Sequence, residues 1–208
     1  MSLEEYHKKR NFSGTPEPAG EENTREATLR FVVQRHAASH LHYDFRLEMD
    51  GVLKSWAIPK GPSLNPEDKR LAVMAEDHPF AYRNFQGEIP PGNYGAGEVE
   101  IWDEGTYRPA ERMEGESDDL EMQSELQDGA LKFVLNGKRM KGEFALVKLK
   151  HAREENAWLL IKHKDQYAVS EPYNAEEHTD KNSIVTAYLE MQNAKKKSVD
   201  PKNNFIPK

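Results

Sequence analysis

The sequence predicts a mainly β protein, a compact antiparallel β-barrel of about eight short strands with short helices at its periphery. Segments that alternate apolar and polar residues recur through the middle of the chain, and Gly, Asn, Asp and Pro separate them at close intervals. Apolar residues at helical spacing occur only towards the two ends. We see no internal repeat, so we expect a single barrel.

The chain is expected to divide into three parts. Residues 1–27 form a partly flexible N-terminal segment, because a stretch rich in Pro, Gly and Glu follows a short helical pattern. Residues 28–175 carry the dense strand pattern and form the barrel. Residues 176–208 form a C-terminal helix and a tail.

The first half of the barrel begins with a hairpin. Residues 41–59 comprise two strand patterns joined by Asp50-Gly51, a pair typical of a tight hairpin turn. A short apolar strand follows at 70–75. Residues 88–97, EIPPGNYGAG, are irregular, because proline lacks a backbone donor and glycine weakens a strand.

The second half continues the β pattern. Residues 97–109 are expected to form another hairpin, and the acidic residues 111–129 a solvated loop or an exposed helix. Two strands surround Asn136-Gly137, and residues 157–164 add one more. Ile184, Tyr188 and Met191 then recur at helical spacing behind Asn182 or Ser183, each of which suits an N-cap.

Composition excludes several classes of protein. The chain has 208 residues, a net charge of -7 and no cysteine, which rules out a disulfide scaffold and thiolate metal ligands. We expect a cytoplasmic protein, because no apolar run is long enough for a membrane span and the N-terminus has no secretory pattern. A monomer is the default expectation.

Residues 40–48, HLHYDFRLE, concentrate metal-binding chemistry on one face of a strand. Alternate positions hold imidazole, carboxylate and guanidinium groups: His40, His42, Asp44, Arg46 and Glu48. His42 and Asp44 can reach one ion from the same side, and imidazole with carboxylate suits Mn, Fe, Zn or Ni. Arg46 on the same face indicates an anionic substrate; its fork of donors suits phosphate, and a keto-acid cosubstrate stays open.

The third metal ligand stays open at this point. His36 lies six residues upstream and can fold back, which would leave His78 and Arg46 for the substrate. Alternatively His42, Asp44 and His78 match the His-x-Asp…His triad of non-haem iron oxygenases, which also occupy β-barrels.

Two longer stretches carry a family resemblance. They read QRHAASHLHYDFRLEMDGVLKSWAIPKGPS and KRLAVMAEDHPFAYRNFQGEIPPGNYGAGEVEIWDEGTY, and TPEP precedes them. Together they resemble the 3'-phosphoesterase domain of bacterial DNA ligase D, the multifunctional end-joining ligase, from about residue 6 to about residue 168. No ligase or polymerase module accompanies them here, so the chain resembles the stand-alone form of that domain.

The resemblance implies a manganese-dependent β-barrel enzyme, with other divalent transition metals as substitutes. Its substrates would be the 3' ends of DNA or DNA/RNA primer-templates, from which it removes a 3'-phosphate or a terminal ribonucleotide to leave a 3'-hydroxyl for a separate ligase and polymerase. The family's metal ligands match His36, His42 and Asp44; its phosphate-contacting residues match Arg46 and His78; its functional tyrosine matches Tyr82; Gln34 and Lys60 match supporting substrate-binding positions.

One departure and two rival functions accompany this interpretation. The family often reads Arg-Asp-Phe before the TPEP segment, and Asn11 takes the place of that aspartate here. If the aspartate takes part in the ribonuclease step, that step would be weaker in this chain. The rivals are a non-catalytic module that binds nucleic-acid ends around a structural metal, and the iron oxygenase described above.

Overall fold

The computed structural model describes residues 3–20, 28–152 and 155–199. Its strands are β1 (Arg30–Ala37), β2 (Leu41–Met49), β3 (Val52–Ile58), β4 (Lys69–Met74), β5 (His78–Pro79), β6 (Gly87–Ile89), β7 (Gly97–Pro109), β8 (Ala130–Asn136), β9 (Lys141–Lys148) and β10 (Ala157–Lys162). The helices are α1 (Glu4–Lys8), α2 (Asp118–Asp128) and α3 (Ile184–Val199), with 3-10 turns η1 (Phe80–Asn84) and η2 (Ala175–His178).

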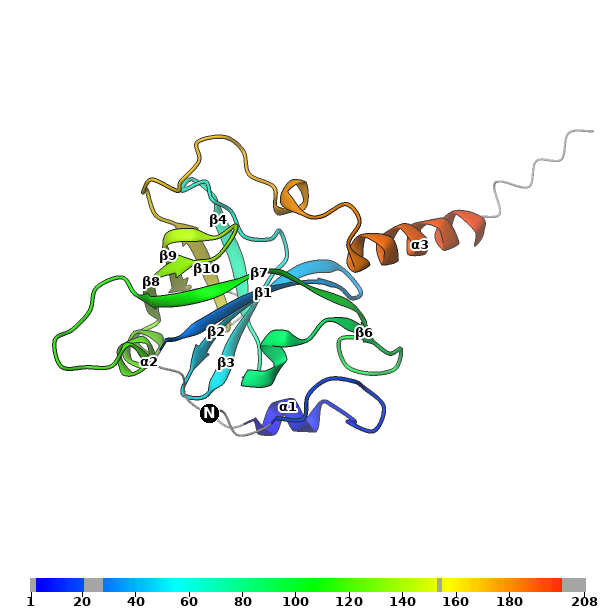
Figure 1. Cartoon of the computed structure of the whole chain (residues 1–208), viewed down its shortest axis with the longest axis horizontal. Coiled ribbons are helices and arrows are strands. Elements are labelled where there is room, and N and C mark those ends of the chain that lie inside the picture. The colour runs from blue at the N-terminus through cyan, green and yellow to red at the C-terminus, as the bar shows by residue number, and fades with distance from the viewer. Residues whose placement is uncertain (1–2, 21–27, 153–154, 200–208) are drawn as a thin grey trace, which may run out of the picture.

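The predicted antiparallel barrel is confirmed. Strands follow the order β1-β2-β3-β4-β10-β9-β8-β7, and the pairing of β7 with β1 closes the ring, so the described residues form an eight-stranded barrel. The short strands β5 and β6 pair with β3 and β7 outside this ring. Figure 1 shows the barrel with α2 and the η2 segment on opposite sides of it.

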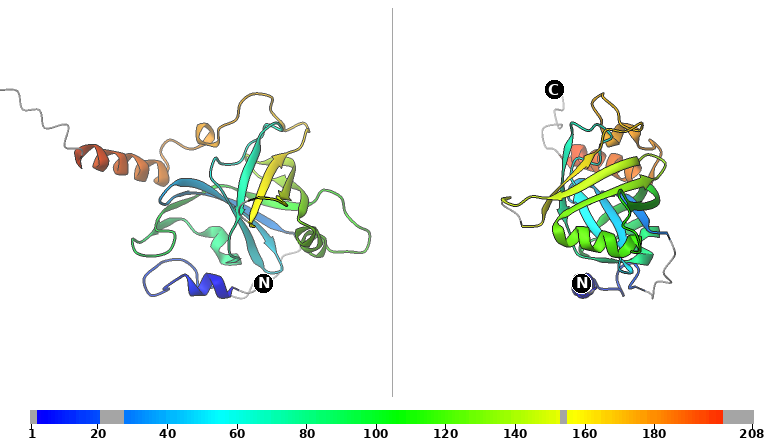
Figure 2. Two further views of the ribbon diagram at one scale, coloured as in Figure 1. Left: turned by 180° about the vertical axis from the view of Figure 1, so that it is seen from behind. Right: turned by 90° about the vertical axis from the view of Figure 1, so that its left-hand side faces the viewer.

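The barrel interior is apolar and closed at both ends. Alternate residues of the strands, among them Phe45, Trp56 and Phe133, are completely buried in one cluster. Met122 of α2 and Ala175 of η2 belong to the same cluster, so each of these elements covers part of the core (Figure 2). All three tryptophans are at most 2% exposed, which fits core packing and leaves none of them free to stack on a base.

A second apolar cluster lies on the other side of β1–β3. It joins the N-terminal segment to η1 and β6 through six buried residues: Tyr6, Leu53, Tyr82, Phe85, Ile89 and Val99. Because this layer covers their outer face, β1 and β2 are buried on both faces along most of their length. The alternating pattern of residues 40–48 therefore marks a covered polar face, which is where the candidate site lies.

Three local expectations need correction or refinement. Residues 97–109 form the single strand β7, with no hairpin. Gly105 lets the neighbouring strand approach closely, since a Cβ there would lie 2.2 Å from the carbonyl oxygen of Asn136. The acidic segment contains α2, whose Met122 is buried, so that face of the helix is not solvated. In α3 the predicted apolar positions Ile184 and Met191 are 46% and 48% exposed.

Other local predictions are confirmed. Asp50 and Gly51 both have positive φ, as a tight hairpin turn requires. Ser183 caps α3, because its Oγ accepts a hydrogen bond from the Thr186 amide at 3.2 Å. Residues 3–20 are irregular beyond α1, but Tyr6 and Glu17 within them are buried against the barrel. The three-part division of the chain stays a prediction.

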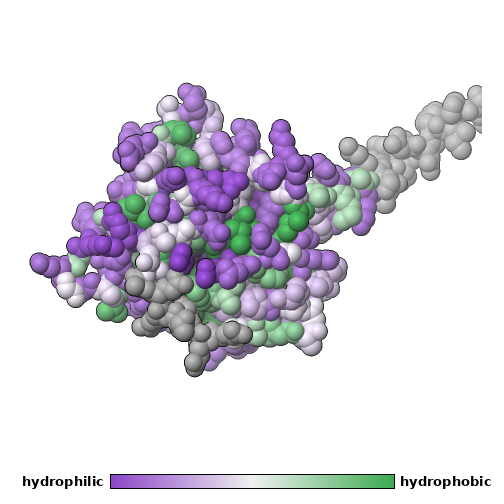
Figure 3. Space-filling view, in the orientation of Figure 1, coloured by the Kyte–Doolittle hydropathy of each residue, from purple (hydrophilic) through white to green (hydrophobic). Residues whose placement is uncertain are grey.

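The surface seen in Figure 3 is largely hydrophilic, with small separate apolar spots. This agrees with 31% charged residues in the sequence. Among the residues that the structure describes, no helix has both the length and the apolar character needed to span a bilayer.

Candidate metal-binding site

Strand pairing brings the predicted ligands together. His36 of β1 lies directly opposite His42 of β2, and Gln34 lies opposite Asp44. Since side chains alternate across a strand, these four residues and Arg46 project from the same outer face of the barrel. The loop between β1 and β2 is short, so the two histidines come within ring contact, with centroids 4.8 Å apart.

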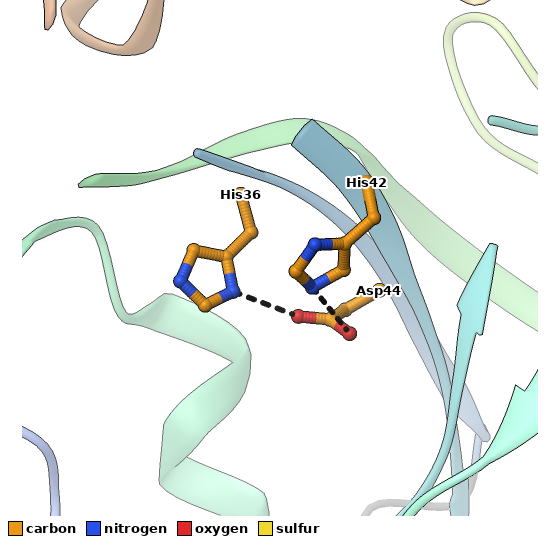
Figure 4. Close-up of side chains that lie close together, drawn as sticks. All are labelled: His36, His42 and Asp44. Carbon is orange, nitrogen blue, oxygen red and sulfur yellow. Dashed lines mark ion pairs between the residues drawn. The ribbon is translucent and has the colours of Figure 1, made fainter. Parts of the chain in front are cut away.

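His36, His42 and Asp44 form a compact group that fits one metal ion (Figure 4). Their ligand atoms all lie within 4.8 Å of one another. The Nδ1 of His36 is 3.5 Å from one carboxylate oxygen of Asp44, and the Nε2 of His42 is 3.7 Å from the other. One ion between them would receive two imidazole nitrogens and a carboxylate, a donor set suited to divalent transition metals.

Backbone carbonyls set the tautomers of both histidines. The Nε2 of His36 lies 2.8 Å from the carbonyl oxygen of Gly95, and the Nδ1 of His42 lies 2.9 Å from that of His40. A carbonyl only accepts, so each of these ring nitrogens must carry the hydrogen. In the neutral rings the lone pairs are then on His36 Nδ1 and His42 Nε2, the two nitrogens that face Asp44. Such outer hydrogen bonds are typical of metal-ligating histidines.

Asp44 is held in its charged form. Burial alone would raise the pKa of its carboxyl, but the Arg46 guanidinium holds that pKa well below its usual range. The Nη2 of Arg46 donates to Asp44 at 3.1 Å. The charged carboxylate and the two imidazole lone pairs next to it together favour the binding of a cation.

Arg46 is fixed by three strands. Its Nε donates to Gln34 at 2.7 Å and its Nη1 donates to Ser55 at 2.8 Å, in addition to the bond with Asp44. A guanidinium has five N–H groups, so these bonds within the described chain leave two for a ligand. Arg46 also lines the cavity next to the triad, and it is the basic group closest to Asp44.

That cavity has a volume of about 290 Å³. The triad, Arg46, His78 and Tyr82 all line it, so the structure brings together every residue that the sequence placed at the centre of the site. An adjoining cavity is typical of reactive metal sites, which keep an open position, whereas structural sites are closed. The donor group found among the described residues contains His36 and not His78, which disfavours the oxygenase triad.

His78 is a neutral, buried imidazole. Burial lowers its pKa well below the usual value, and the nearby positive charges of Arg46 and Arg10 lower it further. Its Nδ1 donates to the carbonyl oxygen of Glu76 at 2.9 Å, and its Nε2 accepts from Arg10 Nη2 at 3.1 Å. The side chain therefore orients Arg10 at the cavity wall.

The N-terminal segment contributes residues that sequence reasoning missed. Arg10 lines the cavity and is held by Glu17 at 2.9 Å and by Glu76 at 3.1 Å. Glu17 also accepts from the Tyr82 hydroxyl at 3.0 Å, and burial raises the pKa of Tyr82 well above its usual value. Glu17 is the acid of the TPEP segment. That motif was the available sign that the N-terminal segment contributes to the site, although it carries no periodic pattern.

Two predicted supporting residues lie elsewhere. Gln34 is completely buried and donates to the carbonyl oxygens of Tyr82 and Phe85, so it positions Arg46 and η1 without facing the cavity. Lys60 is exposed and lines a separate cavity. Asn11 is also exposed, with its Oδ1 accepting from the Ser13 hydroxyl.

The fold and the site together define a class: a closed β-barrel protein with a His-His-Asp donor group that could hold a metal ion and an arginine on its covered outer face. The family follows from comparison. A sequence model described as the DNA Ligase D 3'-phosphoesterase domain matches residues 34–148, more than half of the chain. This chain belongs to that family of phosphoesterase domains.

Relatives agree with this assignment. The chain is 46% identical to the multifunctional non-homologous end joining protein LigD of Pseudomonas aeruginosa over 170 residues, which cover 81% of this chain and 19% of that protein. It is 40% identical to LigD of Mycobacterium tuberculosis over 171 residues, covering 79% and 20%. For Mycolicibacterium smegmatis LigD the identity is 39% over 170 residues, covering 79% and 21%. The chain thus spans about a fifth of the length of the curated relatives it matches.

Proposed function

We propose that this chain is a manganese-dependent 3'-phosphoesterase that heals nucleic-acid ends. It would remove a 3'-phosphate or a 3'-terminal ribonucleotide from DNA or DNA/RNA primer-templates and leave a 3'-hydroxyl. The observation that carries the proposal is the pairing of a His-His-Asp donor group with Arg46 at one cavity, in a chain that belongs to the phosphoesterase domain family.

His36, His42 and Asp44 would hold the metal, which when bound supplies charge neutralisation at a phosphoryl oxygen and a way to activate water. Arg46 uses its two remaining N–H groups to bind phosphate oxygens as negative charge develops there. Arg10 adds a second positive charge at the cavity wall, oriented by His78, Glu17 and Glu76.

His78 in this structure carries no hydrogen on Nε2, since Nε2 accepts from Arg10. Its first role is therefore to position Arg10, and the leaving oxygen would take its proton from water. The Tyr82 ring packs against Arg46, with its centroid 4.9 Å from the guanidinium carbon.

The proposal extends to the setting of the reaction. The relatives are named as multifunctional end-joining proteins, so we infer that the repaired ends pass to a ligase and a polymerase of an end-joining pathway. We place the protein in the cytoplasm as a monomer that associates with DNA ends and with no membrane.

The test uses two labelled primer-templates, one ending in a 3'-phosphate and one in a single ribonucleotide. Each is incubated with manganese, with chelator, and with His42→Ala or the matched control His163→Ala, which removes a histidine that is 40% exposed and paired with Glu143. We expect manganese-dependent conversion to 3'-hydroxyl ends that only His42→Ala abolishes.

Other outcomes are equally informative. End binding without conversion would support the non-catalytic module. A requirement for iron and a keto acid would support the oxygenase. Conversion of the phosphate substrate alone would assign the missing ribonuclease step to the family position that Asn11 occupies.

A further inference from the structure

Tyr94 stands at the rim of the cavity, and neither the metal site nor the phosphate-binding groups use it. It belongs to the loop between β6 and β7, lines the cavity and is 52% exposed. Isolated exposed aromatic side chains are common on protein surfaces. This one differs because it shares a cavity wall with the metal triad and Arg46.

The loop holds Tyr94 in a fixed relation to the metal ligands. The next residue, Gly95, supplies the carbonyl oxygen that accepts from His36 at 2.8 Å. On the other side, the Asn93 side chain donates to the carbonyl oxygens of Pro90 and Gly14, at 3.0 and 3.2 Å. Tyr94 is therefore anchored through its two neighbours, to β1 and to the N-terminal segment, while about half of the residue stays exposed.

Two cations accompany the ring. The Nζ of Lys9 lies 4.9 Å from the ring centroid, and the guanidinium carbon of Arg10 lies 5.6 Å from it. Both cations are themselves held by Glu76. Since more than half of the Tyr94 side chain is still exposed, ring surface remains for a further planar group. An aromatic ring flanked by cations is how proteins bind single nucleic-acid strands without reading their sequence.

The size of the cavity indicates which part of the substrate reaches Tyr94. Its volume of about 290 Å³ lies at the lower limit of small-molecule sites, which span about 300–1,000 Å³. A terminal phosphate and its sugar would therefore be enough to fill the cavity that the triad and Arg46 line. The attached base must then lie at the rim, where Tyr94 stands.

We propose that Tyr94 stacks on the base of the 3'-terminal nucleotide and so adds affinity for the nucleic-acid end at the cavity. This inference rests on the proposed function, because it needs a nucleic-acid 3' end in the cavity. Stacking contacts the flat face that every base shares, so Tyr94 would contribute affinity for any terminal base without selecting among the four.

The experiment crosses a protein change with a substrate change. Recessed duplex ends carry a 3'-phosphate on either a normal terminal nucleotide or one that lacks its base. Wild type, Tyr94→Ala, Tyr94→Trp and the control Tyr167→Ala are compared with manganese. Tyr167 is 43% exposed and follows β10, outside the cavity lining. Thermal unfolding of each variant checks the fold.

We expect Tyr94→Ala to raise KM for the normal end by about 5- to 100-fold with kcat nearly unchanged, because stacking binds ground state and transition state alike. The base-free end should show the same raised KM in wild type and no further change in Tyr94→Ala. Tyr94→Trp should retain the low KM, and Tyr167→Ala should behave as wild type.

A second readout does not depend on turnover. With 2-aminopurine as the terminal base and chelator present, wild type and Tyr94→Trp should quench its fluorescence on binding, and Tyr94→Ala should not. Equal losses by Tyr94→Ala on both ends, or unchanged kinetics and quenching, would overturn the stacking role while leaving the phosphoesterase proposal intact. Failure of wild type to process either end would overturn both.

Discussion

Arg46 shows how much of the site depends on a single residue. Its guanidinium donates to Gln34 on β1, Asp44 on β2 and Ser55 on β3, so one side chain ties together the three strands that carry the site. The side chain is only 4% exposed, so these bonds form in a weakly screened environment. The same group is proposed to contact the substrate, which makes binding geometry and local stability inseparable at this position.

Arg46→Lys should therefore impair both properties. Lysine keeps the charge but cannot reproduce the planar fork, so Gln34 and Ser55 would lose their donors. We expect the free energy of unfolding to fall by at least about 2 kcal/mol and kcat to fall about 100-fold. Denaturant unfolding and steady-state kinetics measure these effects. Arg108→Lys, at an exposed arginine whose hydrogen bonds among the described residues go to backbone carbonyls, should change neither property. An unaffected Arg46→Lys would contradict the interpretation.

His78 makes stability depend on pH in a defined direction. Its folded-state pKa is lowered well below 6.5, mainly by burial and then by Arg46 and Arg10. Below about pH 6.5 the unfolded chain binds a proton that the folded chain does not, so this residue makes stability fall as pH falls, by up to about 1.4 kcal/mol per pH unit. At higher pH the contribution is constant.

His78→Gln should remove that part of the slope. Urea unfolding in chelator between pH 7.5 and pH 5 measures it, with His151→Gln as the control at an exposed position. We expect the variant to show a shallower decrease in stability than wild type and the control to retain the wild-type slope. Identical slopes in all three proteins would show that His78 is not buried in neutral form.

For individual residues, the alternation of side chains along a strand decides which members of the site can be predicted from the sequence. His42, Asp44 and Arg46 stand out because alternation places them on one strand face, and the register then adds His36 directly opposite His42. Arg10 and Glu17 escape detection because they belong to an irregular segment, in which no spacing rule connects residue number to direction. Only tertiary contacts identify their place: Arg10 bonds to Glu76 and His78, and Glu17 accepts from the Tyr82 hydroxyl.

Among the elements, β7 closes the barrel next to the candidate site. Its first residues pair with the end of β1, so that Val99 lies opposite His36 and Glu98 lies opposite Ala37. The local sequence pattern indicated a hairpin over residues 97–109. Strand closure overrides that local signal, since the barrel needs one long strand that pairs with β1, β6 and β8. The 41–59 hairpin was predictable because its turn and both its strands are local.

Gly97→Ala should disrupt this closure. A Cβ at residue 97 would lie 2.1 Å from the carbonyl oxygen of Ala37, and φ is +150°, a conformation essentially reserved for glycine. We expect a loss of at least about 2 kcal/mol in unfolding free energy and weaker metal binding, since Ala37 adjoins His36. Calorimetry and metal titration test this. Gly14→Ala, where the nearest atom is 3.6 Å from the added Cβ and φ is not positive, should be tolerated.

On the scale of the whole molecule, the barrel serves as a support and the site is built on its outside. α2 and η2 cover the interior at its ends, while the N-terminal segment and η1 cover the outer face of β1–β3. The sequence predicted the barrel because its signals are local strands and turns. It did not predict which outer face would be covered, because that depends on packing between segments far apart in the chain, such as the bond from Tyr82 to Glu17.

Metal binding should consequently be linked to global stability. His36, His42 and Asp44 come together only when β1 and β2 pair, so the unfolded chain lacks the site and the ion binds the folded state selectively. Manganese at 100 times its Kd should add about 2.7 kcal/mol to the unfolding free energy, which for a chain of this length corresponds to a rise in Tm of about 5–10 °C. Differential scanning calorimetry with manganese and then with excess chelator measures the shift and its reversal. His42→Ala should show almost none of it, whereas His163→Ala should show all of it. An equal rise in Tm for His42→Ala would place the bound manganese elsewhere on the protein and separate the donor group of β1 and β2 from the proposed chemistry.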